Sequence, residues 1–467
     1  MDVREVIQYT EIFFLYYLFF YVTYISVGNI FAMVKIYRNR QRRLMMNQLD
    51  HEYYYPISII VPAYNESATI LSTINNLLYQ DYKIFEIIVV DDGSTDGTGQ
   101  KVIDAFDLSL ITHPIRLQVL SKPIQAVYGH KIGRISIKLI RKENGGNKAD
   151  SVNAGINVSE YPYIVSMDAD EILQADALKH AIRPFFEDAT TVAVGGLLGV
   201  SNDVVFKHAY PVETKISKSL VAAMQSLEYS RAFMGSRIFS DAFNGNLNVS
   251  GGFGLFKKEA LIRVNGYDVN SVAEDMDLAL RLHRYYVENK IPYNNRYVAN
   301  AICWTQAPFT LKDLTKQRSR WHRGLIQSMW QHRTIMLNPK YGLLGTVSYL
   351  FYFLCELMAP FIELIGIIII SLSFMLGILN VSSAIALALL YFLFCVFQTM
   401  VFYVGRYFIQ DYQFFRGDTL KAFGITILDS IFYRPYLLFV RLYAAITYST
   451  HLHSWHKIER EAFDKTS

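Results

Sequence analysis

The sequence is short of charged residues and of cysteine. Of its 467 residues only 18% are charged and 52% are hydrophobic, which is too apolar for an ordinary soluble protein. The formal net charge of +4 is too small to indicate a nucleic-acid partner. The three cysteines, Cys303, Cys355 and Cys395, lie far apart and form no CxxC pair. We therefore expect neither a disulfide framework nor a zinc site, and we interpret the cysteines as buried thiols.

The glycine-rich loops that hold phosphates are also missing. No Walker P-loop, which ends in Gly-Lys-Ser or Gly-Lys-Thr, is present, and no GxGxxG follows a predicted strand. The stretch "GGFGLF" at Gly251–Phe256 has the wrong spacing for that motif. The glycines alone therefore give only a weak signal of nucleotide binding.

Long apolar runs, by contrast, occur at both ends of the chain. Residues 12–34 contain no charge, and a bilayer is crossed by about 20 residues. A signal peptide is the competing interpretation, but the run is about twice as long as its apolar region should be. Five cations follow the run and place this end in the cytoplasm by the positive-inside rule: Lys35, Arg38, Arg40, Arg42 and Arg43. We interpret 1–49 as a transmembrane helix with a basic cytoplasmic flank, with the N-terminus outside.

Residues 341–448 form the second apolar region. Pro360 divides its first part into an interfacial helix and a span over 361–379, and a second span covers 383–405. The last part, 420–448, contains Asp429, Arg434 and Arg441. A charge in mid-membrane costs about 2.5–3.5 kcal/mol on insertion scales, so we interpret 420–448 as interfacial or re-entrant. Residues 449–467 would then be a cytoplasmic C-terminal segment.

Residues 50–340 have the composition of a soluble α/β domain. The apolar stretches "ISIIVPAY", "FEIIVVDD" and "YPYIVSMDAD" alternate with helical patterns, which predicts a mostly parallel sheet with crossover helices. Each stretch ends in polar or acidic residues. Since ligands lie outside the carboxyl ends of such strands, we expect the three ends to face one site. Residues 107–142 have the pattern of an insertion.

The first acidic motif is "VVDDGSTDGT". Its Asp92 ends an apolar strand and precedes a Gly-rich turn. A carboxylate there accepts hydrogen bonds from a base or ribose but repels a phosphate, so it indicates the nucleoside part of a ligand. A solvated Asp-Gly turn is an equally good interpretation of this motif alone.

The second acidic motif is "SMDADEIL". Asp168 and Asp170 alternate on a segment that we expect to be extended, which would turn both carboxylates to one face. Such oxygen ligands suit Mg²⁺ or Mn²⁺, which would stabilise a diphosphate leaving group. The alternative is a solvated loop.

Two basic motifs complete the set. Lys148 in "ENGGNKADSVNAG" precedes a predicted helix, where it would meet phosphate or simply belong to a capping loop. In "KQRSRWHRG" a helix places Gln317, Arg320 and Trp321 on one face. Arg320 can bind a diphosphate and Trp321 can pack against a sugar ring. The alternative is a basic amphipathic helix on anionic lipid.

The stretch "AEDMDLALRLHR" begins with three carboxylates and continues as a predicted helix. With the other motifs and "SGGFGLF", it resembles the processive, membrane-integrated family 2 glycosyltransferases: cellulose, hyaluronan, chitin and poly-N-acetylglucosamine synthases. The order VPAYNE, VDDGS, GGNKAD, DAD, AED and QRSRW matches along nearly the whole chain. The resemblance implies a cytosolic GT-A-type α/β domain, with mostly parallel strands, flanked by transmembrane and interfacial helices.

The resemblance also implies residue roles. Asp275 is the catalytic base, Asp168 contacts the donor and Asp170 holds Mg²⁺ or Mn²⁺. Ala273 replaces the usual Thr of this motif, and we expect Glu274 and Asp277 to cap the helix and lie in solvent. The residues that would bind the donor and form part of the acceptor site are Ala63, Tyr64, Glu66, Asp92, Lys148, Gln317, Arg320 and Trp321. The segment "HSWHKIER", with Trp455, Lys457 and Arg460, loosely resembles the gating segment that closes over the donor diphosphate in these synthases. An interfacial basic tail is the alternative.

The activity that this resemblance implies is inverting, processive transfer of a hexose from a UDP-sugar to a β-linked polysaccharide, coupled to its export. UDP-glucose is favoured over UDP-N-acetylglucosamine. We expect a multi-pass protein of the plasma membrane with a cytoplasmic catalytic domain. Its partners would be the donor, the polysaccharide and the bilayer, with an accessory export subunit or a homo-oligomer left open and no nucleic acid. Transfer of a single sugar to a membrane lipid is the alternative, and a non-catalytic sensor or transporter of nucleotide sugars is a remoter one.

Overall fold

The computed structural model describes residues 3–46, 54–112, 114–409 and 416–451. These residues form two compact units, and each is described by itself. The sheet unit comprises Leu44–Lys215 and Asn244–Pro308, and the helical unit comprises Met1–Arg43, Ile216–Phe243 and Phe309–Lys457, as far as each is described.

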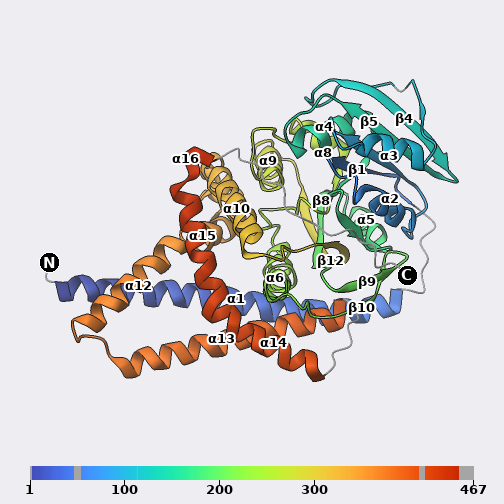
Figure 1. Ribbon diagram of the computed structural model, residues 1–467. Helices are drawn as coiled ribbons and strands as arrows, with labels where there is room; N and C mark the ends of the chain where they lie inside the picture. Colours follow the sequence, from blue (N-terminus) through green and yellow to red (C-terminus); the bar gives the residue numbers. More distant parts are fainter. Residues whose placement is uncertain (1–2, 47–53, 113, 410–415, 452–467) are drawn as a thin grey trace. The chain divides into compact units, whose positions relative to one another are not determined.

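Parallel strands form the core of the sheet unit (Figure 1). The central strand β1 (Ile57–Ala63) is paired in parallel with β2 (Phe85–Asp91) and with β6 (Tyr163–Ser166). The next strand, β5 (Ile135–Lys142), is parallel to β2. Because both faces of these strands are covered, β1 and β2 are almost entirely buried, which explains their continuous apolar sequence. The predicted parallel core is confirmed.

Further strands extend the sheet to ten, in the order β3-β4-β5-β2-β1-β6-β11-β8-β12-β7. On the side of β6, β11 (Gly254–Lys257) lies antiparallel between β6 and β8 (Thr191–Val200). The long strand β12 (Asn294–Thr305) is parallel to β8, and β7 (Glu171–Leu173) is antiparallel to β12. A separate hairpin contains β9 (Val204–Lys207) and β10 (Tyr210–Thr214).

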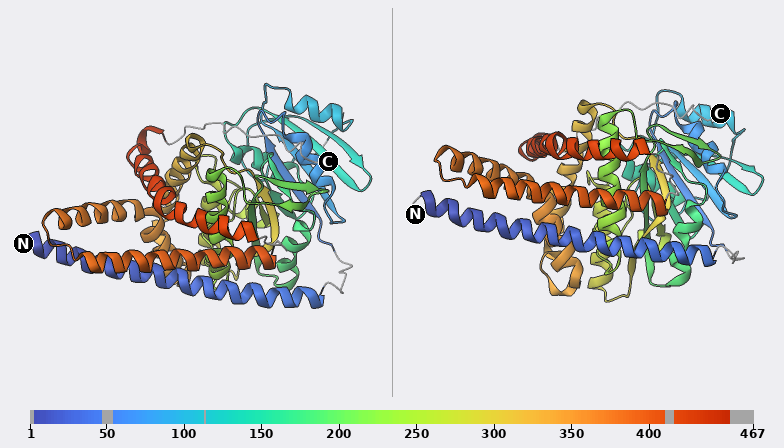
Figure 2. Two further views of the ribbon diagram at one scale, coloured as in Figure 1. Left: turned by 60° about the horizontal axis from the view of Figure 1, so that its bottom comes forward. Right: turned by 90° about the horizontal axis from the view of Figure 1, so that it is seen from below.

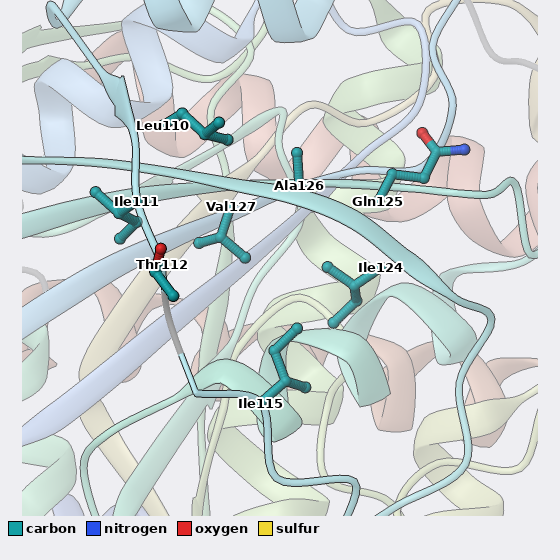
Figure 3. Close-up of a pocket in the computed structure, with 8 residues that line it drawn as sticks. All are labelled: Leu110, Ile111, Thr112, Ile115, Ile124, Gln125, Ala126 and Val127. Carbon is teal, nitrogen blue, oxygen red and sulfur yellow. The ribbon is translucent and has the colours of Figure 1, made fainter.

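The expected insertion at 107–142 is part of this sheet. Strands β3 (Ser109–Leu110) and β4 (Ile124–Ile132) form its edge, and β5 belongs to the parallel core. Interpreting the whole stretch as an insertion was therefore wrong. An open pocket between β3, β4 and the segment after β3 is lined by Leu110–Thr112, Ile115 and Ile124–Val127 (Figure 3). It contains none of the predicted site residues.

Helices cover both faces of the core strands. Alternate residues of β1 explain this: Ile57, Ile59 and Val61 pack in one cluster, with α2 (Ile70–Leu78), α3 (Thr98–Ala105) and α5 (Ala177–Glu187). Ile60 packs in the opposite cluster, with α4 (Lys148–Val158), α8 (Lys258–Arg263) and α9 (Glu274–Glu288). Each fully buried aliphatic side chain contributes about 1.5–3 kcal/mol, so the two clusters fix the strands. As a result, the N-termini of α4 and α9 lie on the same face of the sheet.

Within its described residues, the helical unit carries three helices that are long and apolar enough to cross a membrane: Ile7–Asn39, Val381–Ile409 and Leu420–Ile446. A fourth is added if the pair Leu344–Leu357 and Ala359–Met375, bent by 50°, counts as one span. The break falls next to Pro360, as expected. Figures 1 and 2 show α1 (Val3–Met46) running beside α13 (Val381–Ile409), and the rings of Tyr21 and Phe394 lie 6.0 Å apart.

The charged region 420–446 is a continuous helical segment, made of α14 (Arg416–Leu428), a π-helical turn (Asp429–Tyr433) and α15 (Arg434–Ile446). Its length and composition suffice for a span, whereas we had expected an interfacial or re-entrant segment. The negative charge of Asp429, on which the objection to a span was partly based, is neutralised by ion pairs. The fully buried Asp429 pairs with Arg231 at 2.8 Å and with Arg434 at 3.2 Å.

Two stretches that the sequence analysis placed within 50–340 pack in the helical unit instead. These are 216–243, with α6 (Leu220–Arg231) and α7 (Arg237–Asp241), and the helix α10 (Leu311–Gln331). Apolar residues explain the packing, because Leu227 of α6 and Leu314 of α10 share one cluster with Ile425 and Leu437. Three π-helical turns lie at Ala232–Ser236, Leu344–Ser348 and Tyr352–Leu357, and two 3-10 turns at Arg333–Ile335 and Pro339–Tyr341. The other helices given by the described residues of this unit are the long α12 (Ala359–Met375) and the short α11 (Tyr349–Phe351) and α16 (Tyr448–His451).

Candidate active site

Two loops at the carboxyl ends of β1 and β2 are joined by hydrogen bonds. The Asp92 amide donates to the Ala63 carbonyl at 3.0 Å, and the Glu66 amide donates to the Thr98 hydroxyl at 2.9 Å. Ala63 is buried, Tyr64 is 51% exposed, and the Glu66 carboxylate accepts from Thr69. The predicted nucleoside residues therefore lie on neighbouring loops at one edge of the sheet.

A buried lysine organises the loop that follows β5. Lys142 contacts the carboxylates of both Asp92 and Asp150, the latter at 2.6 Å, and all three side chains are at most 6% exposed. The Gly145 amide also donates to Asp92 at 2.9 Å. Asp92 thus holds the loop before α4, in addition to any role toward a ligand. Sequence reasoning missed Lys142 because its strand was taken for part of an insertion; a lysine that ends an apolar strand was the available signal.

One backbone residue connects the predicted base to the predicted phosphate cation. The Lys148 amine, in the first turn of α4, contacts Asp168 at 2.5 Å and donates to the Gly251 carbonyl at 2.7 Å. The Gly251 amide in turn donates to the Asp275 carboxylate at 2.9 Å. Burial alone would lower the pKa of Lys148, but the charges of Asp168 and Glu274 outweigh it and raise that pKa. Four separated motifs of the sequence therefore meet in the sheet unit.

The "DAD" segment is a turn between β6 and β7 rather than an extended strand. The argument from alternating side chains was therefore wrong, although both carboxylates remain within one turn. The Asp168 side chain is 36% exposed, whereas Asp170 is only 5% exposed.

The next residue, Glu171, is a buried carboxyl that sequence reasoning missed. Its carboxylate accepts from the Cys303 thiol at 3.4 Å, and a side chain at Gly252 would collide with it. Burial, followed by the neighbouring charge of Asp168, raises the pKa of Glu171 to about 8. The glycine at 252 is therefore required by the packing of this acidic turn.

The acidic turn fits a hard divalent cation. Two carboxylates two residues apart supply oxygen ligands of the kind that Mg²⁺ and Mn²⁺ prefer. Within the described residues no group of three His, Cys, Asp or Glu side chains has the geometry of a metal site.

The helix α9 begins at the acidic motif. Asp275 is partly exposed in its first turn, where a carboxylate is favoured by the helix dipole, and its second oxygen accepts from the Met276 amide. Asp277 is fully buried and pairs with Arg281 at 2.7 Å, so the expectation that it lies in solvent was wrong. Glu274 is half-buried.

The remaining predicted residues do not belong to the sheet unit. Gln317, Arg320 and Trp321 lie on α10 of the helical unit, so their approach to the carboxylates stays a prediction. Gln317 is buried, and its Oε1 atom accepts no hydrogen bond from the part of the chain that the structure describes. Trp321 is 41% exposed. The proposed gate residues Trp455, Lys457 and Arg460 lie outside the described residues.

Comparison with protein families decides the class. The model of glycosyl transferase family group 2 matches residues 163–405, which is more than half of the chain, and that of glycosyl transferase family 2 matches residues 58–127. The chain belongs to the family 2 glycosyltransferases. It is therefore an enzyme that transfers a hexose from a nucleotide sugar, and the resemblance inferred from the motifs is confirmed.

Relatives of this glycosyltransferase include poly-beta-1,6-N-acetyl-D-glucosamine synthases. That of Staphylococcus epidermidis is 28% identical over 68% of this chain and 67% of its own length. That of Staphylococcus aureus strain COL is 29% identical over 66% of this chain and 64% of its own length. The chain thus aligns with about two thirds of each relative.

A solved structure supports the fold. The mannosyltransferase PcManGT from Pyrobaculum calidifontis, in complex with GDP-Man and Mn²⁺, superimposes with a TM-score of 0.52 at 17% identity. The match covers 88% of this chain and 98% of the other. It confirms the predicted GT-A-like mixed α/β sheet flanked by long apolar helices.

Proposed function

We propose that this glycosyltransferase adds hexoses processively from a UDP-sugar to a growing β-linked polysaccharide and exports the product across a membrane. The observation that carries the proposal is the series Asp275–Gly251–Lys148–Asp168, joined by hydrogen bonds and an ion pair, which sets an acceptor-side carboxylate beside a cationic, donor-side group. The relationship to poly-N-acetylglucosamine synthases supports the polymeric product.

The proposed reaction is a single displacement at the anomeric carbon. Asp275 takes the proton of the acceptor hydroxyl as its oxygen attacks, which contributes about 10²–10⁴-fold to the rate. The bond to the leaving diphosphate breaks on the opposite side, so an α-linked donor gives a β-linked product. Lys148 meets the charge that develops on the diphosphate, and the nucleoside lies against Asp92 and the loops after β1 and β2.

A divalent metal is part of this proposal. Asp170, with Asp168 beside it, would hold Mg²⁺ or Mn²⁺ at the diphosphate, where the ion stabilises the leaving group as an anion. The Mn²⁺ in the complex of PcManGT supports this choice.

Gln317, Arg320 and Trp321 complete the proposed site. Arg320 would bind the diphosphate in a bidentate manner, and Trp321 offers an exposed apolar face on which an acceptor sugar can pack. The buried Gln317 oxygen, which accepts no hydrogen bond within the described residues, suits a ligand hydroxyl.

The sugar is the next question. Sequence analysis favoured UDP-glucose, but both relatives described above make poly-N-acetylglucosamine. We therefore propose UDP-N-acetylglucosamine as the first donor to test, with UDP-glucose second.

The three or four candidate spans make this a membrane protein, and we propose that it lies in the plasma membrane with the sheet unit in the cytoplasm. The polymer would then leave beside the helical unit, either alone or through a homo-oligomer or an accessory subunit. Three crossings from an outside N-terminus return the C-terminus to the cytoplasm, where Trp455, Lys457 and Arg460 would be able to close over the donor; four crossings would place it outside. A tag at the C-terminus that is accessible only from outside would rule this gate out.

The test is incubation of purified protein with each radiolabelled UDP-sugar, with and without Mg²⁺ or Mn²⁺. We expect UDP release together with a long product that a glycanase degrades. UDP release without any glycan longer than a few sugars would overturn processive synthesis.

A second candidate function is the transfer of one sugar to a membrane lipid. The sequence motifs left this alternative open, and the GDP-Man bound to PcManGT gives a reason to test a mannose donor as well. An organic-soluble glycolipid as the sole labelled product, also when GDP-mannose is the donor, would establish this alternative.

A further inference from the structure

Arg318 lies inside the "QRSRW" motif, one helical turn before Trp321, but we assigned it no ligand. It is 5% exposed, and its guanidinium forms two hydrogen bonds to the two carboxylate oxygens of Glu228, at 3.0 and 2.8 Å. Bidentate pairs of this kind fix the plane of the guanidinium as well as its position. Arg318 is therefore held by α6, a helix distant in sequence from α10.

A third helix closes this arrangement. The Tyr433 hydroxyl, in the π-helical turn before α15, donates to Glu228 at 2.8 Å and lies 3.5 Å from Arg318. Tyr433 is 2% exposed. The charged pair thus has Tyr433 as a buried third partner, and it connects α10, α6 and the segment 420–446.

The guanidinium lies over the indole of Trp321 and, farther away, over the ring of Tyr229, 5.9 Å from its centre. The Arg318 Cζ atom lies 4.4 Å from the centre of that ring, within the range of a cation–π interaction, which is strongest for tryptophan. The ring of Tyr229 lies 6.3 Å from Trp321, at an angle of 31°. With these contacts to Arg318 and Tyr229, Trp321 is still 41% exposed.

We propose that Arg318 is a positioning residue: held by Glu228 and Tyr433, it fixes the orientation of the Trp321 indole and thereby the platform for the acceptor sugar. This inference rests on the proposed function for the role of the platform, but the orientation of Trp321 can be tested without it. The link to Tyr433 implies that packing in the helical unit determines how firmly the nascent glycan is held.

The variants are Arg318→Lys, Arg318→Met and Glu228→Gln, with Lys316→Gln as the matched control. Arg318→Lys keeps the charge but loses the planar, bidentate contact, so we expect it to behave like Arg318→Met. Lys316 lies on the same helix and pairs with Asp313, at 2.9 Å, near the surface. Full-length protein is purified in detergent in each case.

The first readout is independent of activity. The fluorescence of each variant is compared with that of the same variant carrying Trp321→Phe, so that the difference reports Trp321 alone. Since Trp321 is 41% exposed, loss of its support raises acrylamide quenching by at most about twofold in the Arg318 variants. Glu228→Gln should fall in between, and Lys316→Gln should equal the wild type. Unchanged Trp321 quenching in folded Arg318→Lys and Arg318→Met would overturn the inference.

The second readout is the length of the product made from radiolabelled UDP-N-acetylglucosamine. Weaker packing of the acceptor accelerates its release, and we expect the mean chain length to fall about tenfold while the KM for the donor stays within about twofold. Shorter chains with unchanged Trp321 fluorescence would also overturn the inference. If the wild type releases UDP but makes no polymer, the proposed function fails, and the fluorescence comparison alone decides the role of Arg318.

Discussion

The buried lysine at the end of β5 permits a stringent test of the sheet unit. Lys142 is wholly buried between Asp92 and Asp150, each at most 6% exposed. The change Lys142→Met keeps the apolar stem but leaves two carboxylates buried without their cation. Removing one partner of a buried ion pair costs about 3–5 kcal/mol. For a unit of this size each kcal/mol lowers the Tm by about 2–4 °C, so we expect a fall of about 6–20 °C.

The assay is thermal unfolding of purified full-length protein followed by circular dichroism. The control is Lys179→Met, because Lys179 and Asp81 lie 3.5 Å apart with side chains 44% and 62% exposed. An exposed pair contributes about 0–1 kcal/mol, so the Tm of this control should change by at most about 4 °C. Adding Asp150→Asn to Lys142→Met removes one of the two stranded charges and should restore part of the loss.

The same change should act on the donor. Asp92 holds the loop before α4 through Lys142 and the Gly145 amide, and Lys148 follows that loop. We therefore expect an increased KM for the nucleotide sugar in those molecules that remain folded. A Tm of Lys142→Met that matches the Lys179→Met control would refute the reasoning, since it would mean that the three groups are not a buried charged unit.

Three further predictions concern the chemistry and the pH response. Asp275→Asn keeps only one of the two oxygens that accept from the Gly251 and Met276 amides, so it should fold with some loss of stability yet lose about 10²–10⁴-fold in UDP release; a loss of only a few-fold would contradict the assignment of the base. Removal of divalent metal with EDTA should abolish transfer, and added Mg²⁺ or Mn²⁺ should restore it; full activity in EDTA would exclude the metal. Burial lowers the pKa of His283 from 6.5 to about 4, so on acidification the unfolded chain takes up the proton at a higher pH than the folded chain does. The free energy of unfolding should therefore fall between about pH 6.5 and about pH 4, by about 3 kcal/mol in total. Urea unfolding should show a steeper loss of stability with falling pH in the wild type than in His283→Gln, which keeps the contribution of His322, whose pKa burial also lowers to about 4; equal slopes would contradict the assignment.

Local pattern sufficed to predict the core and the ends of its strands. Ile57, Ile59 and Val61 alternate with Ile60 across β1, and both sets are apolar because helices cover both faces. Asp92 and Asp168 follow such strands directly, so their place at the carboxyl edge follows from the parallel arrangement alone. The same reasoning holds for Lys148, which begins α4 after the adjacent strand β5.

Features that depend on pairing and packing were not accessible in this way. The sequence around β5 resembles an insertion because its hairpin partner β4 is partly exposed, and only the register with β2 shows that Lys142 meets Asp92. The sequence predicts Asp277 to be a solvated carboxylate, but Arg281, one turn later, neutralises it. The segment 420–446 likewise reads as too charged for a span, because Arg231, the partner of Asp429, lies nearly 200 residues earlier.

Gly251 and Gly252 show why this site needs glycine although it contains no phosphate-binding glycine loop. The backbone of Gly251 has both of its polar groups engaged, the carbonyl by Lys148 and the amide by Asp275. The backbone of this one residue, through the two peptide groups on either side of its Cα atom, therefore connects the base to the cation. At Gly252 a methyl group would lie 2.4 Å from the Glu171 carboxylate and push apart the acidic turn that carries Asp168 and Asp170. Gly252→Ala should accordingly disturb the donor side of the site, through Glu171, more than it disturbs Asp275.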